Sequence, residues 1–275
     1  MAKPKVCVLR AAGTNCDTET AFAFQKAGAE VESVHINRFI SGERNLAEFQ
    51  ILAIPGGFTY GDDIAAGKIL ANELKTRLSD DIKKFIEEGR LIIGICNGFQ
   101  ILVKAGLLPG NENFQQEASL IINDSGKFED RWVYLRSQAS SPQSQVKCVW
   151  IKGLSEIIYL PVAHGEGKFV TKDKAVLERL KKNKQIVFQY CNESGKLAGY
   201  PYNPNGSTEH IAGICNDTGR ILGLMPHPER HIKFQQHPRW TGERRKTRDG
   251  RRGTEDEGDG LQIFINGVEY ARKNL

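Results

Sequence analysis

The stretch LIIGICNGFQIL at residues 91–102 constrains the fold more than any other part of the chain. Its first five residues form an almost entirely apolar run, which predicts a buried strand, and the apolar spacing over residues 97–105 predicts a helix. A buried strand that passes at once into a helix is typical of α/β proteins, in which helices cover a mostly parallel sheet.

The first hundred residues repeat this alternation of short apolar runs and helical patterns. Asp17 and Ser79 are candidate N-caps of two of these helices, because their side chains can accept a hydrogen bond from the first helical turn. Strands separated by helices imply βαβ units and parallel pairing, and near-continuous apolar strands fit a sheet covered on both faces. We predict strands at residues 5–9, 30–34, 50–54 and 91–95, and helices at residues 18–27, 79–88 and 97–105.

The middle of the chain has a different pattern, with strand-like runs that no helix separates. Such runs favour an antiparallel region. The predicted fold class is therefore α/β, with a mostly parallel central sheet flanked by helices and a small antiparallel addition in the middle of one domain over residues 1–275. We predict further strands at residues 131–136, 146–151, 186–190, 210–214 and 221–225, a short charged helix ending over residues 178–184, and a terminal helix at residues 261–272.

Composition excludes several classes of protein. The net charge of +5, from 38 basic and 33 acidic residues, is small and spread along the chain, so it is weak evidence for nucleic-acid binding. No run approaches the ~20 apolar residues of a membrane span, and the first residues lack the apolar core of a secretory signal. The six cysteines contain no C-x-x-C pair. We expect a cytoplasmic protein with free thiols, two of them (Cys7 and Cys215) buried as small hydrophobic residues.

Residues 235–260 are almost free of aliphatic side chains. A block of basic residues is followed by a block of acidic ones. This composition predicts a mobile, solvated loop whose charges neutralise each other, and the alternative is a docking surface for a partner.

Cys96 lies between two glycines in the segment GICNG, at the turn from strand to helix. This G-x-C-x-G pattern is the cysteine counterpart of the nucleophile elbow, whose sharp turn strains the central residue and leaves no room for side chains on its neighbours. The turn places the sulfur above the carboxyl edge of the sheet and at a helix N-terminus, whose dipole favours the thiolate. We predict that Cys96 is a nucleophile; the alternative is a buried structural cysteine.

A nucleophilic cysteine needs a base, and the base needs an orienting group. Two of the six histidines lie in H-x-E triplets, His164 with Glu166 and His227 with Glu229. His227 follows a predicted strand, and a proline on each side restricts its backbone. Because parallel strands end at one edge of the sheet, we expect His227 to reach Cys96, with Glu229 holding the imidazole tautomer. His164 is the alternative base, and Glu229 could instead cap a surface turn.

Acyl chemistry also requires hydrogen-bond donors aimed at the developing oxyanion. The backbone N–H of Asn97, directly after the predicted nucleophile, is one natural donor. The segment PGGF at residues 55–58 ends the neighbouring strand, and its glycines permit close approach to a substrate. A simple turn is the alternative for this segment, and no G-K-[ST] follows it as in a phosphate-binding loop.

Six segments together resemble the class I (triad-type) glutamine amidotransferases, and among them the family of glutaminase subunits of phosphoribosylformylglycinamidine synthase. The segments occur in order and span nearly the whole chain. The elbow and the H-P-E triplet belong to the wider class, whereas HGEG and NPNGS are typical of the subunit family. The six are AAGTNCD (11–17), PGGFTYGD (55–62), GICNGFQ (94–100), PVAHGEG (161–167), NPNGS (203–207) and MPHPER (225–230).

The resemblance implies a flavodoxin-like fold and a role for each site residue. Cys96 would be the nucleophile, His227 the base and Glu229 its orienting group. Gly57 and Asn97 would supply the oxyanion donors. The 11–17 segment begins with alanine where the family usually has proline, and the charged loop is longer than in compact members.

The resemblance also implies a substrate and partners. Gln100 would contact bound glutamine, which would be hydrolysed to glutamate and ammonia through a cysteine thioester. The ammonia would pass to an ATP-dependent synthetase subunit in de novo purine biosynthesis, and a small bridging subunit would join the complex. No cofactor or metal is expected in this chain, and ATP and Mg²⁺ are expected on the synthetase. Neither nucleic acid nor membrane is an expected partner.

Two kinds of rival function fit parts of the sequence. The first is an amidotransferase that serves another synthetase, or a hydrolase of the same sheet architecture. The second is a regulatory or chaperone-like protein with a redox-sensing cysteine at the elbow. Such a protein would keep Cys96 but would not require His227 and Glu229.

Overall fold

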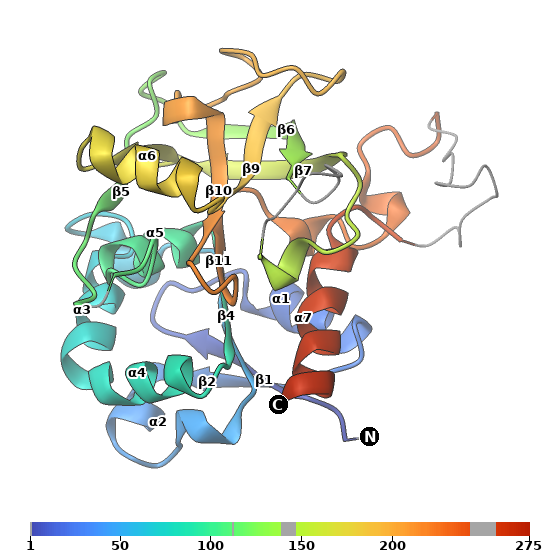
Figure 1. Ribbon diagram of the computed structural model, residues 1–275. Helices are drawn as coiled ribbons and strands as arrows, with labels where there is room; N and C mark the ends of the chain where they lie inside the picture. The colour runs from blue at the N-terminus through green and yellow to red at the C-terminus, as the bar shows by residue number, and fades with distance from the viewer. Residues whose placement is uncertain (1, 112, 139–146, 243–256) are drawn as a thin grey trace.

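One nine-stranded sheet organises the chain, in the order β2-β1-β3-β4-β11-β10-β9-β6-β7. The computed structural model describes residues 2–111, 113–138, 147–242 and 257–275 (Figure 1). The predicted α/β fold class is confirmed, because helices cover both faces of the first half of this sheet.

The first half of the sheet is parallel, as predicted. Its members pair in parallel from β2 through β11, and each predicted strand begins and ends within one residue of its expected bounds. The inner strands are buried along nearly their whole length because helices cover them on both faces. The bounds are β1 (Lys5–Arg10), β2 (Glu30–His35), β3 (Ile51–Ile54), β4 (Leu91–Ile95) and β11 (Ile221–Leu224).

The second half of the sheet is antiparallel and larger than the predicted addition. It continues the same sheet beyond β11 and contains a strand, β7, that was not predicted. A separate antiparallel pair of two short strands lies beside it. The bounds are β10 (Ile211–Cys215), β9 (Ile186–Cys191), β6 (Glu129–Ser137) and β7 (Ile157–His164), with β5 (Ala118–Ile121) and β8 (Lys168–Thr171) forming the separate pair.

The strand predicted at residues 146–151 is wrong. Residue 146 lies outside the described part of the chain, and Val149–Ile151 forms a 3-10 turn, η3. The turn buries two consecutive large side chains, Trp150 and Ile151, whereas a strand would point them to opposite faces. It also lets the Trp150 indole N–H donate to the carbonyl oxygen of Arg220, at 3.0 Å.

Helices cover the parallel strands on both faces. In Figure 1, α3, α4 and α5 lie on one side of β4, and α1 and α7 lie on the other. The predicted helices are present, with the short charged helix α6 ending at Lys182, inside the range predicted for its end, but α2 and α3 were not predicted. The bounds are α1 (Asp17–Lys26), α2 (Ile36–Ile40), α3 (Lys68–Arg77), α4 (Ser79–Glu87), α5 (Asn97–Lys104), α6 (Lys174–Lys182) and α7 (Leu261–Asn274).

The two predicted N-caps are wrong. Cys16 occupies the N-cap position of α1, while Asp17 is already helical and pairs with Arg10 at 2.7 Å. Leu78 occupies the N-cap position of α4, with Ser79 as its first residue. Neither cap residue makes a side-chain hydrogen bond to the helix, so both helices are held by packing of their buried faces.

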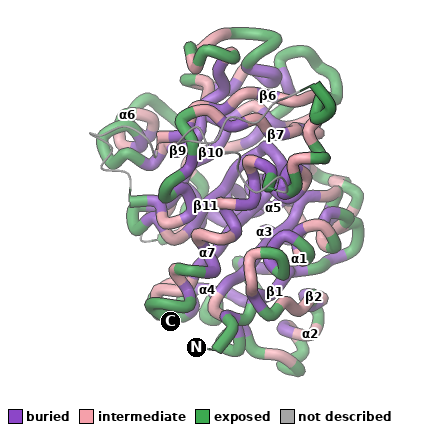
Figure 2. The backbone as a smooth tube through the Cα atoms, turned by 90° about the vertical axis from the view of Figure 1, so that its right-hand side faces the viewer, coloured by how far each residue is buried: buried purple, intermediate pink, exposed green. Residues whose placement is uncertain are grey.

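The core extends through the parallel sheet and α5. Figure 2 shows buried backbone at β1, β11 and α5, with exposed residues on the outer loops and helix surfaces. All eight residues of α5 are buried, so this helix is enclosed on every side. Cys7 and Cys215 are buried in strands, as predicted. Among the described residues, no helix is long and apolar enough to cross a bilayer.

Most of the charged stretch at residues 235–260, including its whole basic block, lies outside the described residues. The part that is described is packed rather than solvated at its C-terminal end. A Cβ atom on Gly260 would lie 2.0 Å from the carbonyl oxygen of Pro228, and one on Gly258 would lie 2.3 Å from that of His231. The chain therefore enters α7 in close contact with the turn that follows β11.

Candidate active site

The strand-to-helix turn at Cys96 has the strained geometry predicted for a nucleophile elbow. Cys96 has φ +52° and ψ −105°, a conformation that residues other than glycine rarely adopt. A Cβ atom on Gly98 would lie 1.9 Å from the carbonyl oxygen of Ile54, and one on Gly94 would lie 2.6 Å from that of Gly98. Both glycines of the motif are therefore needed for the close approach of β3, β4 and α5.

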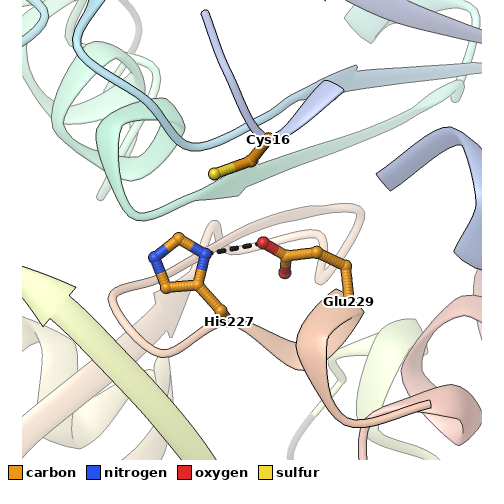
Figure 3. A group of neighbouring side chains, drawn as sticks. All are labelled: Cys16, His227 and Glu229. Carbon is orange, nitrogen blue, oxygen red and sulfur yellow. Dashed lines mark hydrogen bonds and ion pairs between the residues drawn. The ribbon is translucent and has the colours of Figure 1, made fainter. Parts of the chain in front are cut away.

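His227 and Glu229 form a buried pair beside this elbow. They follow β11, which lies next to β4 in parallel, and the Cys96 amide donates to the carbonyl oxygen of Leu224 at 2.8 Å. The Nδ1 atom of His227 lies 2.6 Å from Oε1 of Glu229 (Figure 3). The side chains are 2% and 0% exposed, so water does not compete for this contact.

The environment favours the protonated imidazole. Burial by itself lowers the pKa of His227, but the Glu229 carboxylate and the neighbouring Cys96 sulfur outweigh burial and hold this pKa well above its usual value. An imidazolium next to a cysteine stabilises the thiolate. The structure thus brings Cys96, His227 and Glu229 together in the arrangement of a nucleophile, a base and an orienting carboxylate.

Strand β7 closes one side of this site, which the sequence did not predict. The His227 amide donates to the carbonyl oxygen of Pro161 at 2.8 Å, and the Cys96 thiol lies 3.7 Å from the carbonyl oxygen of Ala163. Since β7 is at the far end of the sheet order, the antiparallel half must curl back over the carboxyl ends of β4 and β11.

His164, the alternative base, belongs to a buried polar network. Its Nδ1 atom lies 3.2 Å from Oδ1 of Asn123, and its Nε2 atom lies 3.5 Å from the amide nitrogen of Asn205. Burial, and then the charge of His227, lower its pKa to about 3. Glu166 does not orient this ring, because its carboxylate points to Lys104, at 3.8 Å. The H-x-E triplet at His164 is therefore not a paired histidine and carboxylate.

The predicted oxyanion segment lies against the His227 ring. Cys16 N–H donates to the Gly56 carbonyl oxygen at 3.2 Å, which ties the segment after β3 to the segment after β1. A Cβ atom on Gly56 would lie 2.7 Å from Cε1 of His227. Gly57 has φ +143°, a value suited to glycine. Asn97 directly follows Cys96 as the first residue of α5, and the roles of Gly57 and Asn97 as oxyanion donors stay predictions.

Side-chain amides connect the elbow to the segment after β7. Asn97 accepts from the Thr59 hydroxyl at 2.7 Å and donates to Asp62 at 3.2 Å and to Gln100 at 2.9 Å. Gln100 in turn donates to the carbonyl oxygen of Glu166 at 2.7 Å. Both polar ends of Gln100 thus have partners within the protein, and its contact with glutamine stays a prediction.

Cys16 was missed as a member of this site. Its thiol is buried beside the His227 ring (Figure 3), and its sulfur accepts a hydrogen bond from Arg230 at 3.1 Å. No sequence pattern joins Cys16 to His227, because more than 200 residues separate them. The available signal was that Cys16 and Arg230 lie in two of the six segments that resemble the amidotransferases.

Comparison with known families decides the class to which this site belongs. Residues 3–271 match the model of the CobB/CobQ-like glutamine amidotransferase domain. The chain belongs to this family. Members of this family known as phosphoribosylformylglycinamidine synthase subunit PurQ are similar over almost their whole length. The protein from Dehalococcoides mccartyi is 49% identical over 99% of this chain and 100% of its own, and that from Archaeoglobus fulgidus is 44% identical over 98% and 97%.

A solved structure supports the same placement within the amidotransferase family. A chain in the structure of PurLQS from Thermotoga maritima superposes with a TM-score of 0.71 at 30% sequence identity. The match covers 98% of this chain and 99% of that chain. The fold described above is therefore that of the amidotransferase family over its full length.

Proposed function

We propose that this protein is the glutaminase subunit of a phosphoribosylformylglycinamidine synthase. One observation carries the proposal: the strained elbow residue Cys96 lies beside the buried pair of His227 and Glu229. A redox-sensing or chaperone-like protein would not need this pair. The relatives that share the family and nearly the whole length of the chain bear the name of that synthase subunit.

The geometry suggests how the site would hydrolyse glutamine. The Cys96 thiolate attacks the side-chain amide carbon, and the tetrahedral oxyanion is stabilised by the amides of Gly57 and Asn97. The imidazolium of His227 protonates the leaving nitrogen, so ammonia departs and a γ-glutamyl thioester remains. His227, held by Glu229, then removes a proton from water, which attacks the thioester and releases glutamate and the Cys96 thiol.

The ammonia would be consumed by a second protein. We propose a synthetase subunit that carries ATP and Mg²⁺, together with a small bridging subunit, since the similar Thermotoga chain comes from a complex named PurLQS. We also propose a cytoplasmic location, which the six free, buried cysteines support.

A reconstituted complex tests this proposal. The Cys96→Ala variant, combined with the synthetase and bridging subunits, should lose glutamine-dependent amination of formylglycinamide ribonucleotide by at least about 10³-fold. Ammonium chloride should still support the reaction, because the synthetase does not need the thiol when ammonia is supplied directly.

Two results would contradict the proposal. Retention of glutamine-dependent activity by Cys96→Ala would show that Cys96 is not the nucleophile. Amination of a different acceptor, with none of formylglycinamide ribonucleotide, would assign the glutaminase to another synthetase. The matched control is Cys191→Ala, a buried cysteine of β9, which should retain both activities.

A further inference from the structure

Three potential metal ligands of different chemistry, Cys16, His227 and Glu229, lie close together at the active site. One ligand atom each from Cys16, His227 and Glu229 lie within 4.8 Å of one another, and all three residues are buried (Figure 3). Cys16 comes from the turn between β1 and α1, whereas His227 and Glu229 come from the turn after β11. The fold therefore assembles a sulfur, a nitrogen and an oxygen from two distant parts of the sequence.

One of these ligands has an unused oxygen. The Glu229 side chain is fully buried, and within the described residues its Oε2 atom has no hydrogen-bond partner. Buried polar atoms in proteins nearly always have partners, because leaving one unpaired costs about 1–3 kcal/mol. The hydrogen bond from His227 satisfies only Oε1, so the carboxylate retains a free coordinating position next to the imidazole.

We propose that Cys16, His227 and Glu229 form a binding site for Zn²⁺, and that the bound ion inhibits the enzyme. Thiolate, imidazole and carboxylate are the three ligand types that Zn²⁺ takes in proteins, with bonds of about 2.0–2.3 Å. A tetrahedral ion with such bonds separates its ligand atoms by about 3.3–3.8 Å. The present separations of up to 4.8 Å require side-chain shifts of about 1 Å. Water would supply the fourth ligand.

The charges around the cluster permit a cation. Two positive charges oppose a cation at the cluster: the protonated His227 ring, which gives up its proton when it binds a metal, and Arg230, whose guanidinium donates to the Cys16 sulfur at 3.1 Å. The same guanidinium lies 3.4 Å from the carboxylate of Glu19, which offsets its charge. The Glu229 carboxylate then remains as the negative charge facing the site, and the Cys16 thiol adds a second one when it loses its proton to water on metal binding.

The inhibition follows from the chemistry of imidazole and rests on the proposed function, whereas the binding does not. A neutral imidazole carries one proton, and coordination through Nδ1 leaves that proton on Nε2. His227 would then have no lone pair with which to accept a proton from Cys96 or from water. The ion would also replace the hydrogen bond through which Glu229 holds the ring.

Cadmium binding to the full chain gives a readout that is independent of activity. Cd²⁺ resembles Zn²⁺ in its preference for thiolate and imidazole, and a cadmium–thiolate bond absorbs in the ultraviolet. The wild-type chain should show this absorption on titration with Cd²⁺, and added Zn²⁺ should displace the Cd²⁺ and remove the absorption. Cys16→Ala should lose the absorption and bind Zn²⁺ at least about 10- to 100-fold more weakly.

Two matched cysteine variants locate the sulfur ligand. Cys96→Ala and Cys191→Ala should bind both ions like the wild type. Glu229→Gln, which preserves the shape of the side chain, should weaken binding while keeping the absorption at saturating Cd²⁺. This second ligand variant keeps the test valid if Cys16→Ala folds poorly.

The opposite results would overturn the proposal. Unchanged binding by Cys16→Ala, loss of binding by Cys96→Ala, or no binding by the wild type would each show that the cluster is not a metal site. In the reconstituted complex, Zn²⁺ should inhibit glutamine-dependent but not ammonium-dependent amination. The Cys16→Ser variant should need about 10- to 100-fold more Zn²⁺ for the same inhibition. Cadmium binding by the wild type, without inhibition of the complex by Zn²⁺, would support the metal site but contradict the proposed inhibition.

Discussion

At the scale of single residues, burial decides what each ionisable group can do. His227 and His164 are both buried histidines near Cys96, yet their pKa values shift in opposite directions. The Glu229 carboxylate outweighs the burial of His227, whereas the side-chain partners of His164 within the described residues are the neutral amides of Asn123 and Asn205. The first ring can therefore hold a proton during catalysis, and the second remains neutral.

Replacing Glu229 with glutamine tests the orienting role directly. The amide can hold the ring but cannot stabilise its positive charge, and it favours the wrong tautomer. We expect kcat of glutamine hydrolysis to fall by about 10²- to 10⁴-fold. The matched control is Glu166→Gln in the other H-x-E triplet, which should cost less than about 10-fold. A larger loss of kcat in Glu166→Gln would indicate that His164, and not His227, acts as the base.

His164 should make the stability of the protein depend on pH. Its pKa is about 3 in the folded protein and about 6.5 in the unfolded chain, so below pH 6.5 only the unfolded chain binds the proton. Stability from this residue is therefore complete above pH 6.5 and is lost as the pH falls towards 3, by up to about 1.4 kcal/mol per pH unit.

Urea denaturation between pH 7.5 and 5 measures this effect. The wild type should lose stability more steeply with falling pH than His164→Gln, which cannot take up the proton. Equal slopes in the two proteins would mean that the ring is not neutral in the folded state or is not buried when the chain is folded in solution.

At the scale of elements, the elbow joins three pieces of secondary structure at backbone contact. Gly98 lies where α5 meets β3, with 1.9 Å between its Cβ position and the Ile54 carbonyl oxygen. We expect Gly98→Ala to lower the free energy of unfolding by at least about 1–3 kcal/mol, since backbone cannot move as a flexible side chain can. Gly199→Ala, which meets open space, should be close to neutral in the same denaturation assay.

Equal stability of these two glycine variants would show that α5 can shift away from β3. In that case the elbow would be less constrained than its geometry indicates. Activity measured on the same variants would then show whether Cys96 keeps its position.

The elements also show where sequence patterns succeed. The parallel strands and three of the helices among them were predicted within one or two residues, because a buried strand next to a helix has a clear local pattern, whereas α2 and α3 were not predicted. The 3-10 turn at Trp150 was predicted as a strand, because a short apolar run does not reveal which of its side chains will face the core. Strand β7 was missed because Pro161 interrupts its pattern.

At the scale of the whole molecule, the C-terminal helix closes the fold. The Phe264 ring of α7 packs edge-on against Phe24 of α1, with 4.9 Å between ring centroids. We expect Phe264→Ala to cost about 3–5 kcal/mol in the free energy of unfolding, because both side chains are fully buried. Phe22→Ala, a 44% exposed ring on α1, should cost less than about 1 kcal/mol.

Comparable losses in the two phenylalanine variants would contradict this view of α7. Helix α7 would then be peripheral, although its N-terminus packs against the turn that carries His227 and Glu229. Chemical denaturation monitored by circular dichroism and by tryptophan fluorescence distinguishes the two outcomes.

The sequence by itself determined the individual strands of the parallel half, the elbow at Cys96 and the pairing of His227 with Glu229, because each depends on residues that are close together in the chain. Only the tertiary structure decided that β7 returns across the site to Ala163 and that Cys16 lies beside His227. These contacts join segments tens to hundreds of residues apart. The first contact depends on how the antiparallel half of the sheet curls, and the second depends on the order of the strands in the parallel half. Periodicity within a single segment carries no information about either.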